Sequence, residues 1–97
     1  FTSLTGTSGT LIFDNTITLN NNADNSLNVM TFGAGGITKN GSGKLTFVGE
    51  NNYFTGAINI NAGEIELGAN NALQGGNALT LANTAGAQLN MNGYSLT

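Results

Sequence analysis

The stretch Gly41–Ile60, GSGKLTFVGENNYFTGAINI, decides the fold of this chain. It holds two short runs of alternating apolar and polar residues, Lys44 to Val48 and Ala57 to Ile60, between clusters of Gly, Asn and Thr. The stretch that follows, residues 61–82 (NAGEIELGANNALQGGNALTLA), is a near copy of this arrangement. Alternation with a period of two indicates strands that bury one face, and an immediate near copy indicates a repeated structural unit.

The composition of the chain excludes several classes of function. Its 97 residues suit one domain, and only 7% of them are charged, against about a quarter in ordinary globular proteins. The net charge is -3 and the only basic side chains are Lys39 and Lys44, so we expect no binding of nucleic acid. The chain has no Cys and no His, which excludes disulfides and thiolate or imidazole metal sites.

The ends and the hydropathy of the chain give expectations about its context. It begins Phe1-Thr2-Ser3 without a Met, and it contains neither a charged leader followed by an apolar run nor a long apolar stretch. We therefore expect a piece of a longer mature chain, with no signal peptide and no direct membrane insertion.

Strand-like alternation runs along the whole chain, whereas helical periodicity is nearly absent. The segments that alternate best predict strands at Leu11–Phe13, Ile17–Leu19, Leu27–Phe32, Ile37–Lys39, Lys44–Val48, Ala57–Ile60, Glu64–Leu67, Ala78–Leu81, Gln88–Met91 and Tyr94–Leu96. So many short strands without a helix predict an all-β chain.

The spacing of these segments indicates how they are arranged. Ile17, Ile37, Ile58 and Leu79 are separated by 20, 21 and 21 residues, and the series closes less regularly at Leu96. A second series runs more loosely through Leu11, Met30, Leu45, Ile65 and Leu89. A recurrence near 20 residues without helices predicts a β-solenoid, in which each coil of chain stacks on the previous one. We expect about five coils, or a column of roughly 24 Å at the usual strand spacing.

Stacked coils place equivalent residues in columns along the axis. Predicted inward columns on one face contain Leu45, Phe47, Ile65, Leu67, Leu89 and Met91. Those on another face contain Ile17, Ile37, Ile58, Ile60, Leu79 and Leu81. One predicted outward column contains Thr18, Thr38, Asn59 and Thr80. Gly and Asn, which tolerate positive φ, lie where the strands end and predict corners whose Asn side chains bond between coils.

An antiparallel meander or sandwich is the competing fold. Asn40-Gly41 lies between two strand-like runs, and this dipeptide favours a tight hairpin. A sandwich accounts for the alternation but not for the constant phase of the repeat, so we favour the solenoid.

The segment Gly41–Gly68 also resembles a known family. Its sequence, GSGKLTFVGENNYFTGAININAGEIELG, is similar to the passenger-associated repeat of bacterial autotransporters, the type V secretion family. The matching positions are Gly41, Gly43, Leu45, Phe47, Gly49, Asn52, Tyr53, Gly56, Gly63, Ile65, Leu67 and Gly68. The remainder resembles the degenerate coils that flank such repeats. One departure is Phe54-Thr55, which stands where the family has a short polar run, and it puts the local turn geometry in doubt.

The resemblance implies a fold, a location and a kind of function. In that family the repeat is part of a right-handed parallel β-helix stalk, which is exported through an outer-membrane barrel and displayed at the bacterial surface or released. Its marked positions are structural, so the resemblance assigns no catalytic residue to this chain.

The carboxylates offer little for catalysis. They are Asp14, Asp24, Glu50, Glu64 and Glu66. Glu64 and Glu66 alternate on one strand, so both should lie outward on a solvated face about 7 Å apart. The register that aligns Gly43 with Gly63 also sets Lys44 beside Glu64, which predicts a weak, exposed ion pair between coils. Polysaccharide lyases on this fold need clustered carboxylates and a basic proton acceptor, and this chain has neither arrangement.

Four other patterns in the sequence resemble functional sites. Calcium-binding nonapeptides would need an Asp after Gly35-Gly36 or Gly75-Gly76, and none is present. Asn40-Gly41-Ser42 has the pattern of a glycosylation site but is better interpreted as a turn. The Thr column is interrupted by Asn59, which argues against ice binding. Of Tyr53 and Phe54, one should plug the core or a corner, and the other can project to solvent as an aromatic contact.

Together these observations predict one β-solenoid segment over residues 1–97, with the autotransporter-type repeat at 41–68. We expect a non-catalytic structural or adhesive stalk segment, secreted and displayed at the bacterial cell surface, with no cofactor, metal or catalytic residue. Its partners would be neighbouring coils of the parent chain, copies of itself, or a host-surface ligand. The alternative is a self-assembling unit that stacks end to end into a filament or dimer, because a solenoid piece has an unpaired strand edge at each end.

Overall fold

The computed structural model describes residues 1–49, 52–82 and 86–95, and within these ranges it contains strands and no helix. The strands are β1 (Thr10–Ile12), β2 (Ile17–Leu19), β3 (Asn25–Leu27), β4 (Met30–Phe32), β5 (Ile37–Lys39), β6 (Lys44–Phe47), β7 (Ile58–Ile60), β8 (Glu64–Leu67), β9 (Leu79–Leu81) and β10 (Gln88–Asn90).

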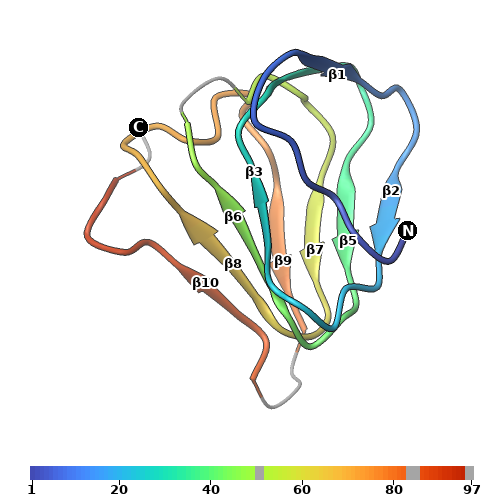
Figure 1. Cartoon of the computed structure of the whole chain (residues 1–97), viewed down its shortest axis with the longest axis vertical. Helices are drawn as coiled ribbons and strands as arrows, with labels where there is room; N and C mark the ends of the chain where they lie inside the picture. The colour runs from blue at the N-terminus through green and yellow to red at the C-terminus, as the bar shows by residue number, and fades with distance from the viewer. Residues whose placement is uncertain (50–51, 83–85, 96–97) are drawn as a thin grey trace.

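All strand pairs are parallel, and the chain winds into a β-solenoid (Figure 1). One sheet has the order β2-β5-β7-β9, a second has the order β10-β8-β6-β3, and β1 pairs with β4 on a third side. Single bridges extend this third side, from Thr31 to Asn52 and from Asn52 to Leu73. Each coil therefore visits three sides in turn, which confirms the predicted all-β solenoid.

The register of the first sheet agrees with the sequence spacing. Ile17 pairs with Ile37, Ile37 with Ile58, and Ile58 with Leu79. Asn40-Gly41 forms a corner and no hairpin, because β5 and β6 belong to different sheets. The amides of Asn40 and Gly41 both donate to the carbonyl of Leu19 in the coil before, at 2.8 and 3.3 Å. The antiparallel alternative is therefore wrong.

Two details of the predicted arrangement are wrong. Leu11 and Met30 do not continue the column of Leu45; its neighbour is Asn25, on β3. The predicted strand Leu27–Phe32 is in fact β3 and β4, separated by a corner at residues 28–29. The alternation of buried positions passes through this corner without a break, because Val29 also packs against the core. The sequence pattern alone therefore does not show the bend.

The structure forms about four coils and not five. Each of the two long sheets has four strands, and the bridge between Gly6 and Leu27 adds a partial coil at the start. The predicted strand at Tyr94–Leu96 is absent from the described part of the chain, and Leu96 itself lies outside it. Ser95 instead bonds back to the preceding coil: its backbone amide donates to Asn70 Oδ1, and its carbonyl accepts from the backbone amide of Asn71.

The core is the set of inward columns. Leu45 and Ile65 pair, as do Phe47 and Leu67, and all four side chains are buried. The Phe54 ring lies 5.1 Å from the Phe13 ring and 6.0 Å from the Phe47 ring, which ties the third side of the solenoid to the second sheet. Buried aromatic contacts of this kind add to the stabilisation from apolar burial.

Outward and corner positions also stack. Thr18, Thr38, Asn59 and Thr80 are register partners, as predicted for the outward column. At the corner that follows, the side-chain Nδ2 of Asn61 donates to Oδ1 of Asn40 at 2.8 Å. Inside the third side, the Thr31 hydroxyl donates to Asn52 Oδ1 at 3.0 Å, and Asn52 Nδ2 donates to the carbonyl of Ala72 at 2.8 Å. These bonds satisfy polar groups that the stacking buries.

A matched pair of Ile substitutions tests the inward columns. Ile60 is fully buried, whereas Ile12 is 68% exposed. We expect Ile60→Ala to lower the free energy of unfolding by about 2–5 kcal/mol because it leaves a cavity in the core. The same change at Ile12 should cost at most about 0.5 kcal/mol. Urea denaturation followed by circular dichroism measures both, and equal losses would contradict the assigned orientation.

Candidate functional site

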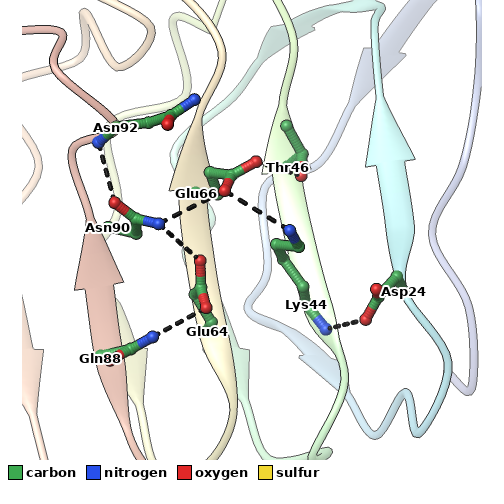
Figure 2. Close-up of polar contacts among 8 residues, drawn as sticks. All are labelled: Asp24, Lys44, Thr46, Glu64, Glu66, Gln88, Asn90 and Asn92. Carbon is green, nitrogen blue, oxygen red and sulfur yellow. Dashed lines mark hydrogen bonds and ion pairs between the residues drawn. The ribbon is translucent and has the colours of Figure 1, made fainter.

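The outward face of β6, β8 and β10 carries the main group of charged and amide side chains (Figure 2). Alternation places the side chains on this face, since Leu45, Ile65 and Leu67 occupy the inward positions between them. We call this group the polar ladder; its members are Asp24, Lys44, Thr46, Glu64, Glu66, Gln88 and Asn90.

Glu64 is held by two amides of the last coil. Its Oε1 accepts from Gln88 Nε2 at 2.8 Å, and its Oε2 accepts from Asn90 Nδ2 at 3.0 Å. Hydrogen bonds stabilise the ionised carboxylate, so the bonds from Asn90 and then from Gln88 lower the pKa of Glu64 below 4.5. The side chain is thus an ionised acceptor at neutral pH, which does not suit it to act as a general acid.

The ion pair between coils forms with a different glutamate from the one predicted. Lys44 is the register partner of Glu64, but its Nζ lies 3.4 Å from Glu66 Oε2. Both oxygens of Glu64 are already bonded to amides, whereas Glu66 is within reach of the long lysine side chain. The lysine side chain is 34% exposed, so the pair contributes little to stability.

The remaining carboxylates make structural contacts. Asp24 Oδ1 accepts from the amide of Lys44 at 3.0 Å, and Asp14 Oδ1 accepts from the amide of Ala34 at 3.2 Å. Both bonds join one coil to the next. Glu50 lies outside the described residues. Within the described ranges, no three acidic side chains lie close enough together to hold a metal ion.

A cavity of about 300 Å³ lies away from the polar ladder, at the C-terminal end of the solenoid. Ile58, Leu73, Gln74, Gly76, Asn77, Leu79 and Leu89 line it. None of these side chains titrates, so no carboxylate of the described residues lines the cavity. This arrangement brings together no acid-base pair or nucleophile in a cleft.

The aromatic pair Tyr53 and Phe54 divides as predicted. Phe54 is fully buried in the core, whereas Tyr53 is half-buried and stacks on Phe32 with ring centroids 5.3 Å apart. Three exposed apolar side chains, Ile12, Met30 and Phe32, lie on β1 and β4 beside this pair. We call Ile12, Met30, Phe32 and Tyr53 the apolar stripe.

Lys39 is a residue whose placement the sequence analysis missed. It occupies an inward position between Leu19 and Ile60 and is fully buried. Its Nζ donates to the carbonyl of Gly41. The signal was present in the alternation, because an inward Ile37 sets the residue two positions later inward as well. A lysine is almost never found at a buried position unless it is paired.

In the described ranges, no helix is long and apolar enough to cross a bilayer.

Comparison with known proteins identifies the central repeat. Residues 37–67 match the family model described as Passenger-associated-transport-repeat, so the chain carries this repeat across β5 to β8. The chain is also 36% identical over 62 residues to the Adhesin BmaC autotransporter of Brucella suis biovar 1 (strain 1330). That alignment covers 64% of this chain but only 2% of the relative. The comparison with solved structures found no match to this chain.

The bonds to Glu64 predict an acid-sensitive contribution to stability. Because the folded pKa of Glu64 is lowered, its contribution is present above 4.5 and is lost as the pH falls through the folded pKa. We expect Glu64→Gln to reduce the loss of thermal stability between pH 6 and pH 3, relative to the unchanged protein. Asp14→Asn, which removes a carboxylate elsewhere, is the control. Identical pH profiles for Glu64→Gln and the unchanged protein would refute this role.

Proposed function

We propose, from the passenger repeat at residues 37–67, that this chain is a non-catalytic stalk segment of an autotransporter passenger, secreted and displayed at the bacterial surface. The observation that carries the proposal is the parallel register of the coils, in which Ile37 lies between Ile17 and Ile58. A column of such coils is a stiff spacer whose length grows with the number of repeats. The adhesin name of the relative supports surface display.

The polar ladder supports a mechanical role better than a catalytic one. Lys44, Glu64 and Glu66 each bond to a side chain on an adjacent coil, and none of them faces the cavity. Charged and amide groups in this arrangement keep the outer surface solvated and reinforce the stacking.

An adhesive contribution would come from the apolar stripe. Ile12, Met30 and Phe32 are exposed on β1 and β4, on the side of the solenoid. Exposed apolar groups that gather on one face are typical of protein contact surfaces. We therefore propose the stripe as the surface that would meet a host-surface ligand.

Removal of one whole coil tests the stalk function in cells that display the parent protein. Deletion of residues 37–57 joins Gly36 to Ile58. The register is kept because Ile58 then occupies the position of its partner Ile37. We expect the shortened passenger to remain accessible to external protease. Deletion of residues 37–47, which removes half a coil, should reduce display because it places inward columns outward. Equal display of both variants would overturn the proposal.

The apolar stripe has its own test. If Phe32→Ser abolishes cell adhesion while display stays intact, the result supports the stripe as the contact surface.

Self-association through the end of the solenoid is a second candidate, favoured by one observation. Leu79 and Leu81 occupy inward positions but are 45% and 50% exposed, whereas their partners Ile58 and Ile60 are buried. A further coil would cover them, supplied either by the parent chain or by another copy. An uncovered edge of parallel strand also pairs readily with other chains.

Light scattering of the 97-residue chain separates the two sources of that coil. If copies stack, the mean mass rises with concentration, and Leu81→Asn lowers it towards the monomer because a polar side chain then lies in the contact. Ile12→Asn, on the side of the solenoid, is the control. A monomer at all concentrations would eliminate self-assembly and leave the parent chain as the source.

A further inference from the structure

Lys39 places an amine at a fully buried position of the core. It is fully buried between Leu19 of β2 and Ile60 of β7, in a column whose other members are aliphatic. Neither of these flanking strands, Ile17–Leu19 and Ile58–Ile60, contains a titratable residue. An ammonium group at such a position loses its hydration, which favours the neutral amine.

The corner beside Lys39 is built around the amine. The Nζ atom donates to the carbonyl of Gly41, and Gly63 lies directly above it in the next coil. A Cβ added at Gly63 would stand 2.7 Å from this Nζ and 2.4 Å from the carbonyl oxygen of Gly41. Gly63 also has a φ of 70°, which favours glycine. The sequence thus keeps space at this corner for the lysine head group.

Few charges lie close enough to compensate an ammonium at this corner. The charged residues at the start of the strands that follow this corner are Asp24, which immediately precedes β3, Lys44 on β6 and Glu64 on β8. Asp24 and Glu64 make bonds to other groups, namely the Lys44 amide and two side-chain amides. The buried Oδ1 of Asn21, near the same turn, has no hydrogen-bond partner. No carboxylate forms an ion pair with Lys39 in the described part of the chain.

We propose that Lys39 is a proton-sensitive latch: loss of its proton tightens the stacking of the β5 coil on the coils of β2 and β7, and gain of a proton loosens it. This inference rests on the fold and does not depend on the proposed function.

The direction of the pH effect follows from linkage. Burial lowers the pKa of Lys39 below 10.5, and the Asp24 carboxylate opposes this in part. The unfolded chain therefore binds the proton more tightly than the folded chain does. The free-energy cost of burying the charged amine is fully present below the folded pKa of Lys39 and disappears as the pH rises towards 10.5. The stability of the fold therefore increases with pH between these two values. A single proton can change the ratio of folded to unfolded chain by at most about tenfold per pH unit.

The test compares the unchanged 97-residue chain with three variants in urea denaturation between pH 6 and pH 10.5, the upper end of the window in which the lowered pKa of Lys39 acts. We expect the midpoint of the unchanged chain to rise with pH. Lys39→Met should raise the midpoint at pH 6 and remove this rise, while Lys39→Arg, which stays charged, should lower the midpoint at every pH. Lys44→Met is the control, because it removes a lysine that lies on the outer face. The urea midpoint of this variant should still rise with pH.

A measurement on the unchanged protein covers the case in which Lys39→Met does not fold. The Cε resonance of Lys39, followed by NMR against pH, should titrate below 10.5. Titration at or above that value would overturn the proposal. So would a folded Lys39→Met variant that keeps the same rise of the midpoint with pH.

Discussion

A coil of this chain can bury its inward side chains only when another coil lies on it in parallel register. Strands of three or four residues are too short to form a core of their own, and almost every backbone bond outside the turns runs from one coil to the next. The consequence is visible within the molecule. Ile58 and Ile60 are buried beneath the last coil, whereas Leu79 and Leu81, at the same positions in that coil, are half exposed. Stability in this architecture comes from the neighbouring coil and grows with the number of coils.

The same register governs the outer surface. Residues that point outward are brought beside their equivalents, so Lys44, Glu66 and Asn90 meet although they are far apart in sequence. Such a column favours opposite charges or amides, because like charges in direct register repel. The polar side chains on this surface therefore form their hydrogen bonds and ion pairs with side chains of adjacent coils. This explains why Glu64 and Glu66, although neighbours on one face, offer no arrangement of acid and base around a cleft.

The passenger repeat gives this architecture a context. It spans β5 to β8, the two coils in which the inward columns are most completely buried. The relative named as an adhesin is far longer than this chain, since the alignment covers 2% of it. In a long solenoid of repeated coils, each segment has to be stable and keep the parallel register, whereas a binding site is not needed in every segment. Lys39 departs from that pattern, because it places a titratable group inside the stack.

The sequence by itself determined the class of fold, the period near 20 residues, the inward and outward columns of β5 to β9, and the repeat family. The first three depend on the alternation and spacing of residue types along the chain, and the repeat family is indicated by the motif at Gly41–Gly68. Tertiary structure alone decided the corner at residues 28–29, the number of coils, the pairing of Lys44 with Glu66 and the burial of Lys39. In each case several conformations keep the same alternation, and the choice depends on distances between side chains on different coils. Lys39 is buried because Ile37 and Leu19 fix its register, and the energy of the whole stack outweighs the preference of one amine for water.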